Sequence, residues 1–168
     1  MLTSHTYDIR LSEMKDANQL MELDMLVWNA STSPAPMQWR SRQQYLQYCP
    51  PGSQLIAAQE DQVCGYVGFH PPTGMPVNRH VYEIHIAVHP DFRRSGVATA
   101  LMKAMKQHAL EQGIRKLRLR VLSSNPGAVA FYEQCGFVTE GRLVSEFRIG
   151  GRDVDDILMA YFIDVLAV

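Results

Sequence analysis

The chain has 168 residues, a formal net charge of −1, and 46% apolar and 20% charged residues, a composition typical of one globular domain. A charge so close to zero argues against nucleic acid or an anionic membrane as a partner, although a short basic run lies between Arg115 and Arg120. No apolar run is long enough to span a bilayer, and the N-terminus lacks the features of a signal peptide, so we expect a cytoplasmic location.

The elements of the first half are predicted from hydrophobic periodicity and from turn residues. In chain order they are a strand at 7–11, a helix at 12–28, a short helix at 40–48, and a hairpin of strands at 54–59 and 63–70. Ser12 is expected to cap the first helix. A polar stretch containing prolines separates the two helices.

The second half continues the alternation of strands and helices. It is predicted to contain a strand at 81–88, a helix at 95–112, a strand at 117–122, a helix from Pro126 to Gly136, and a final strand pair at 137–147 and 156–162. This order is that of an α/β domain with a mixed sheet. The chain has no internal repeat and no linker, so we expect a single domain over residues 1–168, with a core at about 7–162.

The three cysteines are widely spaced and form no CxxC pair. This spacing favours packed free thiols over a disulfide framework or a zinc site. We therefore expect the protein to bind no metal.

The segment Arg93–Ala98 lies where the strand at 81–88 turns into the helix at 95–112. Its small residues allow a ligand to approach the backbone, and the first amides of a helix have no acceptor inside the helix. The helix dipole adds partial positive charge at this end, which suits a diphosphate. Taken alone, however, the segment is better explained as a plain turn in which Gly96 supplies flexibility, because it matches neither a Walker A loop nor a three-glycine fingerprint.

Two blocks of residues change this interpretation. They are Val88-His89-Pro90 followed by Arg93-x-x-Gly96-x-Ala98, and then Asn125, Ala128, Phe131-Tyr132-Glu133 and Gly136-Phe137. Together the blocks resemble the signatures of the GCN5-related N-acetyltransferases (GNAT). The resemblance implies a single-domain fold with a central mixed, mostly antiparallel sheet, splayed between its fourth and fifth strands and flanked by about four helices. It also implies acetyl-coenzyme A as the acyl donor.

The resemblance further implies how the donor binds. The pantetheine arm pairs with the backbone around Ile86 and Val88 like an added strand, and the pyrophosphate sits on the amides of 94–99. Asn125 contacts the cofactor arm or only caps its helix, and the two roles are compatible. The implied cofactor-binding residues are Ile86, Ala87, Val88, Arg93, Arg94, Ser95, Gly96, Val97, Ala98, Thr99, Asn125 and Tyr132.

Acetyl transfer to an amine needs a base for the ammonium and an acid for the departing thiolate. The resemblance makes Tyr132 the acid, whereas its pattern alone favours a core aromatic residue. On an extended strand, Glu83 and His85 share one face, and Tyr82, Ile84, Ile86 and Val88 share the other. The resemblance favours Glu83 as a base acting through water, with His85 second. Either side chain is equally well explained as an ordinary strand residue.

The acceptor is less defined by the sequence. The resemblance places the acceptor pocket near the first two helices and the final strand pair, which makes candidates of Trp28, Asn29, Met37, Trp39 and Tyr45. Two tryptophans suit an apolar or cationic group, although Trp28 is better explained as a core residue. Acidic residues at 153, 155 and 156 attract a cationic acceptor or are simply solvated.

Three functions stay open. The first is acetylation of a small amine or amino acid by direct attack in a ternary complex. The second is acetylation of a protein N-terminus or lysine, and the third is a non-catalytic acyl-coenzyme A sensor. For the first, a small-molecule amine is the expected partner, and a homodimer is possible because the last strands often mediate dimers in relatives.

Overall fold

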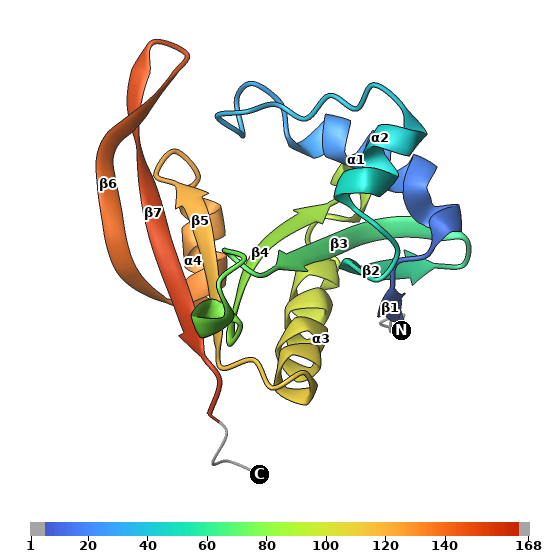
Figure 1. The fold of residues 1–168 in the computed structure, drawn as a ribbon. Helices are drawn as coiled ribbons and strands as arrows, with labels where there is room; N and C mark the ends of the chain where they lie inside the picture. Colours follow the sequence, from blue (N-terminus) through green and yellow to red (C-terminus); the bar gives the residue numbers. More distant parts are fainter. Residues whose placement is uncertain (1–5, 165–168) are drawn as a thin grey trace, which may run out of the picture. The chain divides into compact units, whose positions relative to one another are not determined.

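The computed structural model describes residues 6–164, and Figure 1 shows the arrangement of the elements within them. The strands are β1 (Asp8–Leu11), β2 (Gln54–Gln59), β3 (Gln62–His70), β4 (Val81–Val88), β5 (Lys116–Leu122), β6 (Val138–Ile149) and β7 (Arg152–Phe162). The α-helices are α1 (Ala17–Val27), α2 (Arg42–Tyr48), α3 (Val97–Glu111) and α4 (Pro126–Gln134). Short 3-10 helices lie at Met14–Asp16, Pro76–Asn78 and Pro90–Phe92.

The seven strands form one mixed sheet in the order β1-β2-β3-β4-β5-β7-β6, which confirms the predicted fold class. The β4–β5 pair is parallel, and the β1–β2, β2–β3, β5–β7 and β6–β7 pairs are antiparallel. Among the described residues, the β4–β5 register covers three pairs, from Val81–Lys116 to Glu83–Arg118, at the start of both strands.

Contacts between Cα atoms divide the chain into two compact units. Unit 1 comprises the chain up to Val27 together with Met37–Gly68 and Ile86–Met105. Unit 2 comprises Trp28–Pro36, Phe69–His85 and the chain from Lys106 onward. Each unit is described by itself below.

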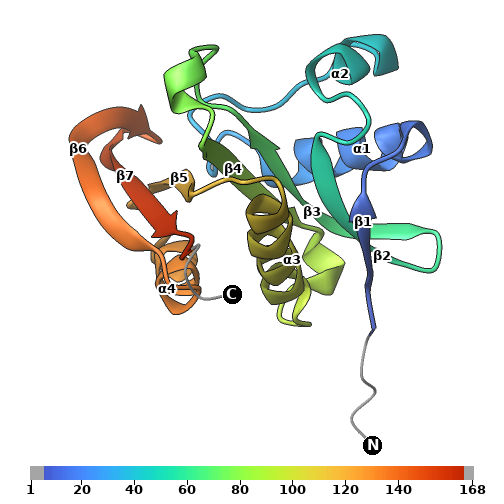
Figure 2. The same ribbon diagram turned by 60° about the horizontal axis from the view of Figure 1, so that its bottom comes forward.

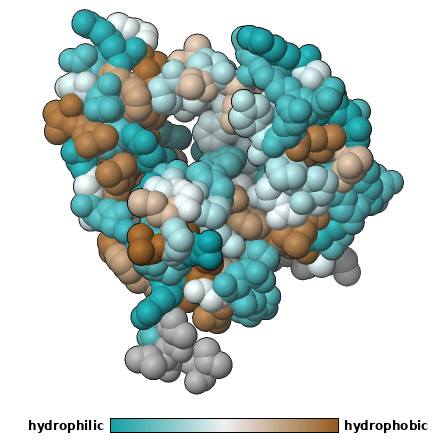
Figure 3. Space-filling view, in the orientation of Figure 1, coloured by the Kyte–Doolittle hydropathy of each residue, from teal (hydrophilic) through white to brown (hydrophobic). Residues whose placement is uncertain are grey.

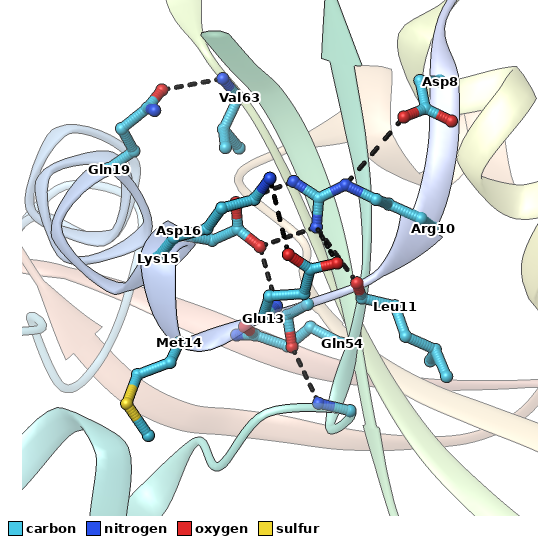
Figure 4. Close-up of polar contacts among 12 residues, drawn as sticks. Asp8, Arg10, Leu11, Glu13, Met14, Lys15, Asp16, Gln19, Gln54 and Val63 are labelled. Atoms are coloured by element: carbon cyan, nitrogen blue, oxygen red, sulfur yellow. Dashed lines mark hydrogen bonds and ion pairs between the residues drawn. The ribbon is translucent and has the colours of Figure 1, made fainter. Parts of the chain in front are cut away.

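A charged cluster joins β1 to the start of α1 in unit 1 (Figure 4). The Arg10 guanidinium donates to both carboxylate oxygens of Asp16, at 2.8 and 2.9 Å, and Asp16 is only 3% exposed. Asp16 also accepts a hydrogen bond from the amide of Glu13 at 2.7 Å, which caps the 3-10 turn before α1. The buried carboxylate is therefore paired on both sides, as a buried charge must be.

The prediction that Ser12 caps the first helix is wrong. A 3-10 turn capped by Glu13 comes first, so α1 begins only at Ala17. The Ser12 hydroxyl instead accepts a hydrogen bond from the amide of Gly52 at 3.2 Å, and its own amide donates to the Gln54 carbonyl at 2.8 Å. The Ser12 hydroxyl therefore makes a tertiary hydrogen bond in place of the local capping bond.

In unit 2, α4 packs against one face of β5 and β7 (Figure 2). The side chains of β5 on that face, Leu117, Leu119 and Val121, are buried. Gly136 ends the helix with φ 91°, and a Cβ at this position would lie 3.2 Å from the Tyr161 ring. The glycine is therefore required both by its conformation and by its neighbour.

The β6–β7 hairpin is long and curved (Figure 1). β7 begins at Arg152, four residues earlier than the predicted start at 156. The β6–β7 register shifts between Leu143 and Phe147, where Ser145 has φ 52°. Asp155 stabilises this bulge by accepting hydrogen bonds from the Ser145 amide at 2.8 Å and from Arg142 Nε at 2.6 Å.

β6 is an edge strand of the sheet, and Figure 3 shows apolar side chains along the edge of unit 2 that it forms. Val138 is 55% exposed and Val144 is 73% exposed. The charged residues Arg142, Glu146 and Arg148 alternate with them along the strand. Charges on an edge strand counteract pairing with other chains.

We expect Asp16→Asn to lower the free energy of unfolding at pH 7 by about 2 kcal/mol, because it removes a charged hydrogen-bond acceptor from Arg10. Burial raises the pKa of Asp16, but the bonds from Arg10 and the Glu13 amide lower it more, so the folded-state pKa lies below the usual 3.8. The stabilisation is therefore complete above pH 3.8 and is lost as the pH falls through the lower folded pKa.

Urea denaturation at a series of pH values tests this expectation. The difference between the wild type and Asp16→Asn should shrink below pH 3.8. Asp8→Asn is the matched control, because Asp8 is exposed and lies 3.9 Å from Arg10 Nε; its effect should stay under about 0.5 kcal/mol. A loss for Asp16→Asn that does not change with pH would contradict the account.

Candidate functional site

The turn between β4 and α3 lies within unit 1 and holds most of the predicted cofactor-binding residues. β4 ends at Val88, Pro90–Phe92 forms a 3-10 turn, and α3 begins at Val97. The His89 imidazole caps the 3-10 turn by accepting from the Asp91 amide at 3.1 Å. The tip of the turn, Arg93–Gly96, is thus bounded by two rigid elements.

Two residues of the tip have a left-handed backbone. Arg94 has φ 61° and Gly96 has φ 84°. Positive φ values in a short turn orient neighbouring amides into concavities that bind anions. A Cβ on Gly96 would meet no atom within 4 Å, so the space beside it is open.

The start of α3 adds further donors. The amides of Val97, Ala98 and Thr99 are the first of the helix and have no acceptor inside it. The Tyr7 hydroxyl, from the segment before β1, donates to the Ser95 carbonyl at 3.1 Å and so restrains the turn. The turn therefore combines left-handed backbone, the first amides of a helix and exposed arginines at 93 and 94, features that suit an anion.

Gly65 determines how closely β3 approaches this region. A Cβ on Gly65 would lie 2.8 Å from the Ala87 carbonyl oxygen and 3.0 Å from Val97 Cγ1. The adjacent Cys64 carbonyl accepts a hydrogen bond from the His89 amide at 2.8 Å. The absence of a side chain at Gly65 therefore lets the end of β4 and the start of α3 pack directly on β3.

Unit 2 contains the predicted acid, Tyr132, on α4. Its ring packs between Phe131 and Phe137, with centroids at 5.5 and 5.9 Å, and the residue is 8% exposed. Burial, with a smaller contribution from Cys135, raises the pKa of Tyr132 well above its usual value, so the phenol stays protonated. Within residues 6–164 no hydrogen bond to this hydroxyl is found.

Asn125 has the capping role that its position predicts. Its side-chain oxygen accepts a hydrogen bond from the Ala128 amide at 3.1 Å, and Pro126 occupies the first position of α4. The residue is exposed, so its side-chain nitrogen remains available for a ligand. The structure thus confirms the cap and is compatible with the cofactor role.

The two candidate bases have different neighbours in unit 2. The Glu83 carboxylate lies 3.4 Å from Arg118 Nε and 3.8 Å from His70 Nε2, and its side chain is 25% exposed. His85 instead faces Trp28, with ring centroids 6.4 Å apart. Burial first, and the charge of His70 second, lower the pKa of His85 to about 4, so it is neutral near pH 7. Both residues are half-buried.

The predicted two-residue alternation does not hold along β4. The buried residues are Val81, Ile84 and Ala87, which are three apart. Burial along β4 therefore does not follow a two-residue period, and it leaves the predicted sharing of faces untested. A strand that twists or bulges changes which side chains share a face.

The candidate acceptor residues fall into both units. Trp28 and Asn29 belong to unit 2, whereas Met37, Trp39 and Tyr45 belong to unit 1. Tyr45 is 1% exposed and donates to the Gln54 side chain at 2.9 Å, so it is a core residue of unit 1.

Trp39 is half-buried and is held by Asp24. Its indole nitrogen donates to the Asp24 carboxylate at 2.8 Å. Asp24 is 1% exposed and also accepts a hydrogen bond from the Tyr66 hydroxyl. This buried network anchors the segment before α2 to α1.

Comparison with known proteins identifies the family. A profile of the Acetyltransferase (GNAT) family matches residues 17–137. The chain belongs to this family. The match includes the β4–α3 turn and the whole of α4, so both blocks noted in the sequence lie inside it.

Curated GNAT relatives match over shorter stretches. Spermidine N(1)-acetyltransferase of Vibrio cholerae is 40% identical over 74 residues, which are 44% of this chain and 43% of that protein. The ribosomal protein bS18-alanine N-acetyltransferase of Escherichia coli K12 is 40% identical over 53 residues, which are 32% of this chain and 36% of that one. The chain thus spans less than half the length of the curated relatives it matches.

Solved GNAT structures match over nearly the whole chain. The crystal structure of smu.2055 from Streptococcus mutans UA159 has a TM-score of 0.86 and 29% identity, and covers 94% of this chain and 99% of that chain. The structure of yncA from Salmonella typhimurium, determined with its cofactor acetyl-CoA, has a TM-score of 0.82 and 18% identity and covers 97% of each chain. An identity as low as 18% supports the fold alone.

Of the helices that the structure describes, none combines the length and the apolar character that a bilayer span needs. Within residues 6–164, no three His, Cys, Asp or Glu side chains gather as a metal site would require.

Sequence reasoning missed three residues that shape these sites. Gly65 carried a signal, because a glycine inside an apolar strand often marks a close backbone approach. Asp24 carried a weaker sequence signal, because it is an acidic residue within an apolar helix. Arg118 carried none, because its partner Glu83 lies on another strand.

We expect Gly65→Ala to destabilise the protein by about 2 kcal/mol, because the added Cβ is driven into the Ala87 carbonyl and Val97. Gly74→Ala is the matched control, since a Cβ there meets no atom within 4 Å, and it should change stability by under about 0.5 kcal/mol. Chemical denaturation of the two variants and the wild type makes the comparison. Equal stability of the two variants would show that β3 and β4 do not approach as closely as described.

Proposed function

We propose that the protein transfers the acetyl group of acetyl-coenzyme A to a small primary amine by direct attack in a ternary complex. The observation that carries the proposal is the combination of left-handed backbone, first helix amides and exposed arginines at Arg93–Thr99, found in a GNAT chain at the turn between β4 and α3. Tyr132, a largely buried phenol, supplies the second element that the reaction needs.

The residues of the turn fit a diphosphate. Left-handed backbone at Arg94 and Gly96, together with the first amides of α3, offers several N–H donors and the positive end of a helix dipole. The two exposed arginines add charge that complements phosphate oxygens. The open space beside Gly96 leaves room for the ligand to approach the backbone.

Acetyl-coenzyme A supplies a thioester whose C–S bond breaks as the acceptor nitrogen bonds to the carbonyl carbon. In this proposal Glu83 removes one proton from the acceptor ammonium through a water molecule, because only the free amine has a lone pair. Tyr132 donates its phenolic proton to the departing sulfur. The nitrogen loses a second proton as the amide forms, and a proton returned to Tyr132 closes the cycle with one net proton released.

The raised pKa of Tyr132 fits an acid rather than a base. Because burial raises the pKa of Tyr132, the phenol carries its proton near pH 7, which is the form that a general acid needs. His85, with a pKa lowered to about 4, holds an ammonium's proton poorly near pH 7. Glu83 is partly exposed and carries the negative charge that attracts an ammonium.

Similarity alone does not identify the acceptor. One relative is named for spermidine and another for a ribosomal protein alanine. The small-amine acceptor is favoured because the candidate base is partly buried, at 25% side-chain exposure, rather than set on an open surface. The homodimer and the cytoplasmic location stay predictions.

Release of free thiol from acetyl-coenzyme A, measured against a panel of amines, amino acids and peptides, tests the proposal. We expect turnover with at least one small amine or amino acid. Tyr132→Phe keeps the ring packing and removes the donor, so kcat should fall about 100-fold or more while the Kd for acetyl-coenzyme A changes by under about twofold.

Tyr161→Phe is the matched control for the tyrosine variant. Tyr161 packs on the same Phe137, with ring centroids at 5.7 Å, and should keep wild-type turnover after substitution. Tight cofactor binding without any thiol release across the panel would favour a sensor and contradict the proposal. Equal kcat in Tyr132→Phe and the wild type would remove Tyr132 from its role.

A further inference from the structure

One face of β5 in unit 2 carries three cations in alternation. Lys116, Arg118 and Arg120 share this face, while the residues between them are buried against α4. Each cation meets a carboxylate from another strand of the sheet. The pairs are Lys116 with Glu140, Arg118 with Glu83, and Arg120 with Asp156.

Arg118 is held more loosely than Arg120. Arg120 donates to the buried Asp156 through two nitrogens, whereas Arg118 makes an ion pair with Glu83, with Nε 3.4 Å from the carboxylate, and no hydrogen bond to it is found. In the part of the chain that the structure describes, the two terminal nitrogens of Arg118 have no hydrogen-bond acceptor, and its side chain is 38% exposed. A guanidinium with free terminal nitrogens presents a planar fork that matches a carboxylate.

Glu83 and Arg118 face one another in the parallel register of β4 and β5. The chain therefore holds one negative and one positive charge side by side, with the positive one open to solvent at its far end. A zwitterion has the complementary pair of charges on neighbouring atoms. Its ammonium suits Glu83, and its carboxylate suits the terminal nitrogens of Arg118.

The other acidic groups of unit 2 do not favour a polycation. Asp153, Asp155 and Asp156 each pair with an arginine, at Arg148, Arg142 and Arg120 respectively. The hairpin that was expected to attract a cationic acceptor is thus locally neutralised. At Glu83, a polyamine would meet a carboxylate that stands beside a cation, and the cation repels it.

We infer that the acceptor is a free α-amino acid and that Arg118 determines this specificity by binding its α-carboxylate. The inference rests on the proposed acetyl transfer and names the substrate class of that reaction. An α-amino acid places its nitrogen next to its carboxylate, so the carboxylate on Arg118 brings the ammonium to Glu83. A polyamine has no carboxylate, and a peptide N-terminus has an amide carbonyl in its place.

The test compares each of the twenty L-amino acids with its α-amide, in which only the carboxylate is replaced. Thiol release gives kcat/KM, and mass spectrometry identifies the acetylated product. For the preferred side chain the acid should exceed the amide by about 30-fold, the discrimination expected of a charge-assisted hydrogen-bonded pair. The amine of an amino amide is the less protonated of the two, which works against the expected result and makes it more stringent.

Arg118→Gln should lower kcat/KM for the amino acid by about 30-fold, mainly through KM, and change that for the amide by under about threefold. Arg118→Lys keeps the charge without the fork and should fall between the wild type and Arg118→Gln. Arg148→Gln is the matched control, because Arg148 is 76% exposed and paired at 4.0 Å; it should leave both substrates unchanged.

Two outcomes would overturn the inference while leaving acetyl transfer intact. One is equal turnover of acids and amides by the wild type. The other is an equal loss for both substrates in Arg118→Gln, which would indicate a structural role. Absence of turnover with every amine would instead overturn the proposed function, and the specificity with it. Thermal melting and acetyl-coenzyme A titration of Arg118→Gln separate a folding defect from a binding defect.

Discussion

The close approach of β3 to the end of β4 and the start of α3 is the contact on which the turn between β4 and α3 depends. It exists because Gly65 has no side chain where the Ala87 carbonyl and Val97 pack. With β4 ending and α3 beginning against the same strand, the turn between them is short and its ends are fixed. Left-handed residues at its tip and the first amides of the helix are the backbone features on which the proposed diphosphate binding rests.

Unit 2 is organised by charge pairing across strands. The core face of β5 is apolar, and its other face carries cations that each meet one carboxylate from β4, β6 or β7. These pairs differ in what they leave free. Asp156 accepts hydrogen bonds from Arg120, whereas Glu83 and Arg118 form an ion pair without a hydrogen bond. Arg118 therefore keeps donors, and Glu83 keeps acceptors, for a ligand. A pair of this kind carries little net charge, which favours zwitterions over polycations.

Much of the fold could be predicted from the sequence where the determinants are local. The limits of β4 were predicted exactly as found, and Asn125 with Pro126 marked the start of α4, because hydrophobic patterning and capping act over a few residues. Ser12 misled the prediction because a residue 40 positions away, Gly52, uses its hydroxyl. A pattern of neighbouring residues cannot reveal a hydrogen-bond donor that lies so far away in the sequence.

In the candidate site, too, some features have local sequence signals and others depend on contacts between distant residues. The β4–α3 turn and Tyr132 were found from short motifs, and both lie where the motifs placed them. The choice between Glu83 and His85 needed the fold, because alternation along β4 breaks and only contacts from β5 and from Trp28 separate the two environments. Tyr45 was a candidate for substrate binding by position, yet its hydroxyl bonds to Gln54 in the core. Contacts between residues that are not sequence neighbours therefore separate Glu83 from His85 and place Tyr45 in the core.

The central claim is that the turn from Arg93 to Thr99 holds the diphosphate of an acyl-coenzyme A. Titration of the nitrogen-15-labelled protein with acetyl-coenzyme A, followed by amide NMR, tests it most directly. The account predicts large, saturable shifts for the amides of Gly96, Val97 and Ala98, and no such shifts with S-acetylpantetheine, which lacks the diphosphate. Saturable binding that leaves these amides unmoved would contradict it.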